Sequence, residues 1–341
     1  MRAGARERAR ISRDFLVWVV GAAMLGAVVT VAVHFAEERE FARLLEQAHP
    51  WWLLLAGALQ AMTYLAEGEV WRTVTRADGS AINLRMASQL AVAKLFVDQA
   101  VPTGGISGTI LYVQGLLRAG VRRGAALAGV VVATFSYYSS YVLCLSAAVV
   151  IAAAGANLSR AVRSIATTFL IVSATFAVAV LLQPGKEPGP VTRQLERLPL
   201  LRRGLRLLRQ ADSTLAHRPR LLAQAVGWQI AIVFLDAATI WVLLRAVGAD
   251  SHPKVVFTSY MFSSLLRTVG IVPGGLGVFE AASVFMLHGA GIPISAALAA
   301  TLLFRGLSFW LPMLPGLVFA QRLVGLSKRH AARLQRIRMN R

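Results

Sequence analysis

Apolar runs long enough to cross a bilayer constrain this chain more than any other feature of its sequence. Phe15–Phe35, Ala125–Ala154 and Leu221–Val247 each contain about 20 or more mostly apolar residues. In hydrocarbon only helices and closed barrels satisfy their own backbone hydrogen bonds, and the period-two alternation of barrel strands is absent here. We therefore predict an all-α polytopic integral membrane protein with about six spanning helices.

The composition and the charge pattern favour the same class. The sequence is 56% hydrophobic and 15% charged, a balance typical of polytopic membrane proteins. Its formal net charge of +20 is concentrated at the ends of the apolar runs. Positive-inside placement and attraction to anionic headgroups explain this pattern, so we expect no nucleic-acid partner. The basic segments 1–14 and 324–341 predict a multi-pass protein of the cell inner (plasma) membrane with both termini in the cytoplasm.

The apolar segment 255–288 is broken near its middle. One proline and three glycines form the break: Pro273, Gly274, Gly275 and Gly277. These residues cannot continue a helix at low cost, so we predict a re-entrant helical hairpin with its tip at membrane depth. Irregular backbone at that depth requires protein or a water-filled cavity around it, which makes the tip a candidate binding site, flanked by Arg267 and Glu280.

A second broken segment covers 81–117. Lys94 and Asp98 interrupt it, and its break contains Pro102, Gly104 and Gly105, followed by Ser107. Basic residues flank it on both sides, so we predict a hairpin that enters from the cytoplasm. The Gly-Gly-Ile-Ser-Gly sequence around the serine is similar to a nucleophile turn, but no histidine lies nearby in the sequence to act as its base.

The two breaks lie 171 positions apart, from Pro102 to Pro273, and align without a gap. Each of the units 50–154 and 221–323 is predicted to contain a span, a hairpin and a second span. The flanking charges indicate that the first unit begins outside the membrane and the second begins on the cytoplasmic side. We predict inverted-topology repeats, an arrangement found in alternating-access transporters. Segment 15–49 is then an anchor helix with an outer loop, and 155–220 is a linking helix with a basic amphipathic cytoplasmic segment.

Ionisable residues inside membrane spans cost about 2.5–3.5 kcal/mol each, so they are usually paired or functional. Lys94 and Asp98, spaced i, i+4, either neutralise each other or line a polar path. Asp236 either carries a proton or caps a neighbouring helix. Cys144, the single cysteine, and the scattered histidines have no metal-ligand spacing, so we expect no metal and no cofactor.

The second hairpin leaves two interpretations open. Glu280 and Arg305 either form a buried ion pair, or Arg305 holds a lipid phosphate, and Arg267 has the same two alternatives. The helix N-termini at 104–107 and 275–277 either present free N–H groups to an anion or mark tight helix crossings without a ligand.

The motif Pro273–Glu280, together with Gly291–Pro293 and Phe304–Pro312, resembles the lysylphosphatidylglycerol synthase transmembrane family, which includes a lipid flippase region. The resemblance implies a lipid-handling membrane domain in which Glu280 and Arg305 match the charged pattern of the family. Thr103–Thr109 is uncharged where many members carry charges, so we expect a different headgroup preference. Only a short basic tail follows residue 323, so we expect no cytosolic aminoacyl-transferring domain and no lysyl transfer.

These observations predict a flippase-like translocase for an anionic phospholipid or a related lipid headgroup. The alternatives are a membrane-embedded enzyme acting on a lipid or polyprenyl phosphate and a non-transporting membrane partner of a lipid-modifying enzyme. Such an enzyme needs convergent carboxylates or a nucleophile–base pair, and the sequence offers only isolated acids. Anionic membrane lipids are the expected ligands. A homo-oligomer and a lipid-modifying enzyme are the candidate protein partners.

Overall fold

The structure is a computed structural model that describes residues 49–80, 82–100, 105–155, 160–182, 210–269 and 275–323. The predicted anchor helix, most of the predicted amphipathic segment and both basic termini lie outside these ranges. Pro102, Gly104 and Gly274 of the predicted site also lie outside them. Within the described ranges the chain is helical and contains no strand, which confirms the predicted all-α class.

The helices follow one another along the chain with short connections. They are α3 (Pro50–Ala77), α4 (Leu84–Ala100), α5 (Ile106–Arg118), α6 (Arg123–Gly155), α7 (Arg160–Leu181), α10 (Ser213–Ala216), α11 (Pro219–Ala246), α12 (Pro253–Val269), α13 (Val278–Gly289), α14 (Ile294–Arg305) and a π-helical stretch η2 (Gly306–Trp310) that continues α14 to residue 323. Among the described residues, three stretches are long and apolar enough to cross a bilayer: Arg123–Ala153, Pro219–Ala246 and Ile294–Leu323.

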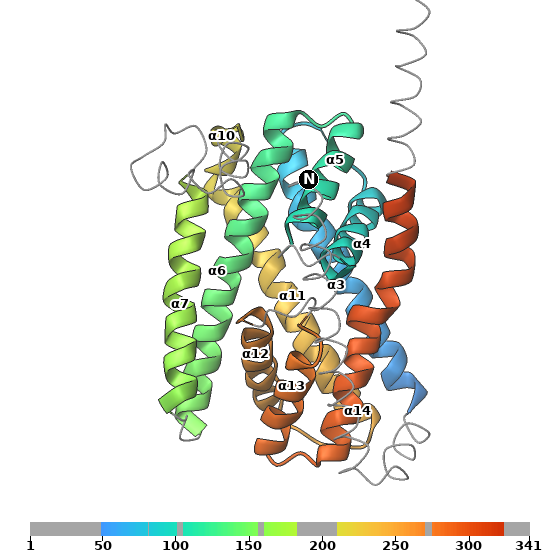
Figure 1. Ribbon diagram of the computed structural model, residues 1–341, viewed down its shortest axis with the longest axis vertical. Coiled ribbons are helices and arrows are strands. Elements are labelled where there is room, and N and C mark those ends of the chain that lie inside the picture. The colour runs from blue at the N-terminus through green and yellow to red at the C-terminus, as the bar shows by residue number, and fades with distance from the viewer. Residues whose placement is uncertain are drawn as a thin grey trace, which may run out of the picture.

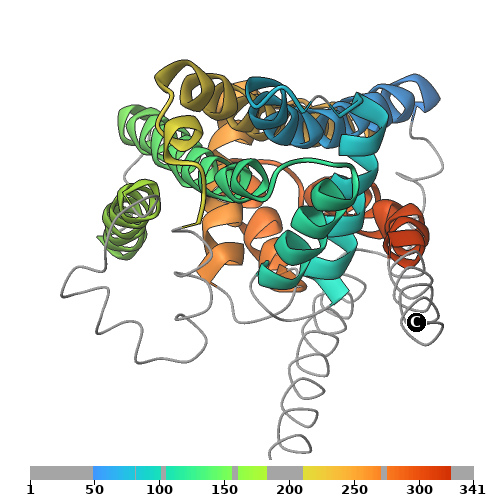
Figure 2. The same cartoon turned by 90° about the horizontal axis from the view of Figure 1, so that it is seen from above.

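The central pair of the bundle is α3 and α11, which pack against each other along their lengths. They run antiparallel, because the His49 N–H at the start of α3 donates to the Ala246 carbonyl at the end of α11 at 3.2 Å. Each helix has 28 residues and begins with a proline, the residue best tolerated in a first helical turn. Seen from above, the pair forms one side of the bundle (Figure 2). Of the hairpin arms, α4 packs on α3 and α12 packs on α11.

The two hairpins start from opposite ends of the bundle (Figure 1). At one end, called here the Arg122 end, Arg122 pairs with Asp78 and Arg118 donates to the carbonyl of Leu323. The α4–α5 hairpin has its base at this end. The α12–α13 hairpin has its base at the other end, called the His49 end, so the described arms of the two hairpins enter the bundle from opposite ends.

Helix bounds refine the predicted alignment of the two units. The arms α4 and α12 both have 17 residues and begin 169 positions apart, at Leu84 and Pro253, and α3 and α11 share that offset. Beyond the tips the offset is 171, from Arg123 at the start of α6 to Ile294 at the start of α14. The alignment at 171 therefore holds for the helices after the breaks, whereas the helices before the breaks match at 169, so the two segments differ by two residues between their arms. Insertions concentrate in such breaks because no helical hydrogen bonds are lost there.

The turns that follow the hairpins have the same conformation. Gly120 and Gly291 both have positive φ, at 85° and 93°. The next residue in each turn, Val121 or Ile292, donates its N–H back to a carbonyl five positions earlier, at 3.1 and 3.2 Å. This is the hydrogen-bond pattern of a glycine-terminated helix, in which a residue without Cβ adopts the left-handed conformation.

The helix α3 extends beyond its apolar part into a charged segment. It continues to Ala77, and its charged residues pair within the helix. Glu69 is buried and accepts from Arg72 and from Arg76, the latter with an N···O distance of 3.2 Å. Ion pairs on one helical face, three and seven residues apart, keep the polar segment helical.

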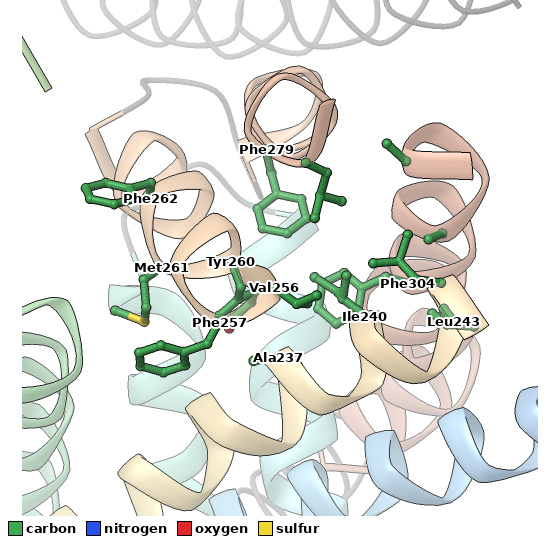
Figure 3. Packing of buried hydrophobic residues seen from close by; sticks show 14 of the residues in the cluster. Ala237, Ile240, Leu243, Val256, Phe257, Tyr260, Met261, Phe262, Phe279 and Phe304 are labelled. Atoms are coloured by element: carbon green, nitrogen blue, oxygen red, sulfur yellow. The ribbon is translucent and has the colours of Figure 1, made fainter. Parts of the chain in front are cut away.

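The buried apolar residues form two main clusters, one around each hairpin. In the cluster around the second hairpin, Phe279 of α13 points toward the space between Tyr260 of α12 and Phe304 of α14 (Figure 3). Its ring centroid lies 6.4 Å from that of Tyr260 and 5.6 Å from that of Phe304. The cluster around the first hairpin includes Trp71 and Tyr112, whose rings stack with centroids 4.1 Å apart. Each hairpin is thus held by its own aromatic contacts.

The contact between α4 and the helical stretch 311–323 that follows η2 generates a first test. A Cβ added to Gly316 would lie 2.6 Å from Cβ of Phe96 and 2.8 Å from the carbonyl oxygen of Val92. We expect Gly316→Val to force these helices apart and to reduce stability by about 1–3 kcal/mol, measured by thermal unfolding in detergent. Gly227→Ala is the matched control, since nothing lies within 4 Å of its Cβ position. Equal melting temperatures for Gly316→Val and wild type would contradict the close packing.

The ion pair at the Arg122 end generates a pH prediction. Burial alone would raise the pKa of Asp78, but hydrogen bonds from Arg122 and Ser80 and the Arg122 charge hold it below its usual range. Because the native pKa is the lower one, the pair stabilises the fold above the unfolded-state pKa and is lost as pH falls through the native pKa. Arg122→Ala should lower the melting temperature at neutral pH, and this difference should vanish in acid. Arg123→Ala, at the neighbouring exposed position, is the control.

Candidate functional site

A polar layer crosses the central helix pair. The amide nitrogen of Gln60 in α3 donates to Oδ1 of Asp236 in α11 at 3.4 Å, and that of Gln229 in α11 donates to Oε2 of Glu67 in α3 at 3.2 Å. Gln60 and Gln229 are 169 positions apart, as are Glu67 and Asp236, so the two contacts are reciprocal. Both glutamines are buried. An acid in an apolar helix requires such a partner, since an unpaired polar group there is costly.

The first hairpin supplies its own anion. Lys94 Nζ lies 2.9 Å from Asp98 Oδ2, and Asp98 Oδ1 accepts the backbone N–H of Gly108 at 3.0 Å, in the first turn of α5. The predicted pairing of Lys94 with Asp98 is therefore formed. Of the two alternatives for the helix N-terminus at 104–107, neither includes what is found at the adjacent Gly108: the protein's own carboxylate accepts its N–H. Gly108 makes this approach possible, since a Cβ there would overlap the carboxylate.

The second hairpin carries a cation at the equivalent place. Arg267 is 169 positions from Asp98, near the end of α12, and its side chain is half-buried. Its Nη2 donates to the Tyr141 hydroxyl at 3.4 Å, and its Cζ lies 5.8 Å from the centroid of Phe279. No carboxylate in the described part of the chain forms an ion pair with it. Gly275, with φ of 63°, lies directly against its side chain, where a Cβ would overlap it.

Glu280 and Arg305 form a buried ion pair. Arg305 Nε donates to Glu280 Oε1 at 2.6 Å, and the side chains are only 4% and 1% exposed. The guanidinium also lies over the rings of Phe279 and Phe309, with Cζ 5.6 and 4.5 Å from the centroids. Of the two interpretations of this pair, the structure adopts the ion pair. Glu280 Oε2 has no hydrogen-bond partner in the described structure, so the carboxylate keeps unused accepting capacity.

The helix α14 changes from α-helical to π-helical geometry directly after Arg305. Residues Gly306–Trp310 form a π-helical turn, which widens the helix by one residue. The Tyr64 hydroxyl of α3 donates to the Leu307 carbonyl in this turn at 2.7 Å. Single π-helical turns occur mainly at functional sites. The turn therefore marks the stretch next to Arg305 as a place where α14 departs from regular geometry.

Asp236 connects the central pair to the second hairpin. Its Oδ1 also accepts from Thr63 at 3.3 Å, and its Oδ2 accepts from the Tyr260 hydroxyl at 2.8 Å. Tyr260 belongs to α12, the arm that carries Arg267, and Arg267 lies within electrostatic range of Asp236. Lys94 lies within the same kind of range of Glu67. Each acid of the central pair thus faces a cation on the hairpin of its own unit.

Some predicted site residues come together and others do not. Arg267, Gly275, Gly277, Glu280 and Arg305 gather at the second tip, whereas Lys94, Asp98, Gly105 and Ser107 form a separate group at the first tip. Gly105 and Gly277 both have positive φ and precede the first residues of α5 and α13.

Sequence reasoning missed four polar residues of the layer: Gln60, Gln229, Tyr64 and Tyr260. A signal existed, because both glutamines and both acids repeat at 169 positions, but the alignment at 171 concealed it. Among the described residues, no three histidine, cysteine or acidic side chains come close enough to hold a metal ion.

The fold and the charged interior define a multi-pass helical membrane protein with an intramembrane polar site. The chain belongs to the lysylphosphatidylglycerol synthase TM region family, whose model matches residues 18–316. It is 25% identical over 91 residues to a UPF0104 membrane protein of Methanothermobacter thermautotrophicus, which covers 27% of each chain. A UPF0104 membrane protein of Pyrococcus horikoshii is 24% identical over 112 residues, 33% of each chain. The match thus spans about a third or less of these relatives.

The buried pair generates a stability test. Glu280→Gln should leave the Arg305 charge buried without its counter-charge and should cost about 3–5 kcal/mol of unfolding free energy. Adding Arg305→Met should recover most of this loss, because the apolar side chain removes the uncompensated charge. Thermal unfolding of the two single variants and the double variant in detergent measures the coupling. Additive losses in the double variant would show that the two residues do not depend on each other.

Proposed function

We propose that this protein is a flippase-like translocase that moves an anionic phospholipid, or a lipid with a related phosphate headgroup, between leaflets. The observation that carries the proposal is Arg267, a half-buried guanidinium at a hairpin tip without an ion-pair partner among the described residues. Such a charge inside the apolar layer is costly unless an anion shares the site. A guanidinium offers paired donors that match a phosphate, which favours a phosphate headgroup as that anion.

The groups around Arg267 suit a headgroup rather than a structural pair. Tyr137 and Tyr141 of α6 lie side by side, with ring centroids 4.8 Å apart, and Tyr141 accepts from the guanidinium. Arg305, within electrostatic range of Arg267, adds positive potential from behind Phe279, although Glu280 balances its charge. With Asp236 protonated, the two guanidiniums and the single carboxylate of Glu280 leave the tip net positive. Hydroxyl donors and a positive field are the features that bind a phosphodiester.

The arrangement of the two units supports an alternating-access mechanism. Equal helix lengths, hairpins based at opposite ends, and the reciprocal Gln60–Asp236 and Gln229–Glu67 contacts are what inverted repeats related by a two-fold axis would produce. We propose that the units rock about the α3–α11 crossing and expose Arg267 to each leaflet in turn. The π-helical turn beside Arg305 is the position where α14 would bend.

The orientation follows from the same charges. In the described part of the chain, basic residues are more numerous at the Arg122 end than at the His49 end. The Arg122 end carries Arg76, Arg85, Arg118, Arg122, Arg123, Arg218, Arg220 and Arg322, and the His49 end carries Arg160, Arg163, Arg245 and Lys254. By the positive-inside rule we propose that the Arg122 end faces the cytoplasm in the cell inner membrane, with both termini on that side. The first hairpin then opens from the cytoplasm and the second from the outside.

Reconstituted vesicles test the translocase. Fluorescent phosphatidylglycerol should become accessible to an external quencher faster in vesicles with protein than in protein-free vesicles. Arg267→Gln should slow this exchange about 10- to 100-fold, because hydrogen bonds to a charged group are worth about 1.5–3 kcal/mol. Arg245→Gln is the matched control, an arginine paired with Asp250 at the His49 end.

The outcomes separate the alternatives. Exchange at the protein-free rate would contradict the proposal. Release of inorganic phosphate or of a cleaved headgroup from the same vesicles would favour the membrane-embedded enzyme instead. Equal exchange by Arg267→Gln and wild type would place the lipid site elsewhere.

A further inference from the structure

We propose that Asp236 is a proton-binding site coupled to Arg267, so that binding of a phosphodiester anion at the second hairpin is accompanied by uptake of one proton. The inference rests on the proposed function, because it takes the anion at Arg267 as given and adds the ion that moves with it. What brings the two residues together is Tyr260, whose hydroxyl donates to Asp236 and whose helix, α12, carries Arg267.

The charges around Asp236 leave Arg267 as its main counter-charge. From α3 it faces Gln60 and Thr63, which are neutral donors, and the titratable Tyr64. From α12 it faces Tyr260 and Arg267. Beyond Arg267 lies Tyr141 of α6.

The other charges in this region have partners of their own. Arg305 of α14 pairs with Glu280 of α13. Glu67 of α3 accepts from Gln229 and lies within range of Lys94, the cation of the first hairpin. Neither Arg305 nor Lys94 therefore acts as the counter-charge of Asp236.

Anion binding and proton binding are coupled because Asp236 and the phosphodiester share the positive charge of Arg267. Burial opposes ionisation of Asp236, and without a ligand the hydrogen bond from Tyr260 and the charge of Arg267 favour the ionised form. A phosphodiester at Arg267 takes over that positive charge and adds a negative one, so the protonated carboxyl becomes favoured and a proton enters from water. Linkage makes the effect reciprocal: protonation of Asp236 must strengthen anion binding by the same factor. Release of the anion at the other leaflet returns the proton there, so the lipid and the proton move together.

The same geometry explains why the equivalent acid is not used in this way. Glu67 occupies the same place in unit one, but the first tip holds the protein's own anion, Asp98, paired with Lys94 and with the start of α5. An external anion therefore has no vacant cation there. We therefore expect proton coupling from Asp236, which lies near Arg267, and not from Glu67.

The experiment measures anion affinity and proton uptake with purified protein in detergent. The probe is dihexanoyl-phosphatidylglycerol, whose phosphodiester keeps a single charge between pH 5 and 8, so any pH dependence belongs to the protein. Dimethyl phosphate forms a second arm that separates a lipid headgroup from a free phosphodiester. We expect the affinity to rise by up to about tenfold per unit of falling pH. A pH-indicator dye in weak buffer should report about one proton taken up per anion bound.

Variants assign the proton to its site. Asp236→Asn keeps a hydrogen-bond acceptor for Tyr260 but cannot titrate, so its affinity should be independent of pH and its proton uptake should be absent. Glu67→Gln should keep the pH dependence. Asp250→Asn, which removes an exposed acid at the end of α11, is the control for loss of a carboxylate. Size-exclusion elution and melting temperature show whether each variant is folded, and Asp236→Glu, which restores a titratable group, should restore the uptake.

Each result decides the proposal. A wild-type affinity that does not change with pH, or the same slope in Asp236→Asn, overturns it while leaving the anion site intact. Loss of the slope in Glu67→Gln alone moves the proton to unit one and also overturns it. Absence of binding in both arms at every pH overturns the site at Arg267, and the coupled proton with it. Binding in the lipid arm only, or in both arms, supports the coupling and identifies the source of the phosphodiester.

Discussion

A helix that is interrupted inside hydrocarbon leaves backbone groups without partners, and the rest of this structure depends on how those groups are satisfied. At the first tip the carboxylate of Asp98 accepts the N–H of Gly108, and in the π-helical turn of α14 the hydroxyl of Tyr64 donates to the carbonyl of Leu307. Both side chains come from a neighbouring helix, so each interruption also fixes the position of that helix. Polar side chains therefore sit at both departures from helical geometry, in addition to the polar layer that crosses α3 and α11.

One arrangement of helices supports two different charge patterns. The equivalent positions 98 and 267 hold aspartate in the first hairpin and arginine in the second. The charge of Asp98 at the first hairpin is thereby balanced by Lys94 and by the N-terminus of α5. The second tip keeps a guanidinium held only by Tyr141 and by the face of Phe279 among the described residues. The two hairpins therefore differ in charge at this position: the first tip holds a carboxylate with its own cation, and the second holds a cation without an ion-pair partner among the described residues.

The sequence predicted the all-α class and the helical arms on either side of both breaks, because hydropathy, glycine and proline act locally. It also predicted the Lys94–Asp98 contact, since i, i+4 spacing puts both residues on one helical face. The reciprocal glutamine–acid contacts escaped notice because they join residues more than 160 positions apart and depend on which faces α3 and α11 turn toward each other. The π-helical turn has no local sequence signal, and it appears only when the Tyr64 hydroxyl is placed against α14. Packing between distant helices decides these features, and a single sequence does not contain that packing explicitly.

A transporter that carries a charged headgroup through a low-dielectric interior must balance the charge of the empty carrier as well as that of the loaded one. A lone guanidinium in such a site would carry an uncompensated charge, with its free-energy cost, whenever the anion is absent. In the proposed mechanism, Asp236, held by Tyr260, Thr63 and Gln60 within electrostatic range of Arg267, provides that balance in the empty state. When the proposed anion binds, the same carboxylate becomes a second negative charge beside one cation, and a proton is the smallest ion that can remove the excess. Electroneutrality in both states of such a carrier requires a titratable acid close to the arginine but not ion-paired with it, which is how Asp236 and Arg267 are placed among the described residues.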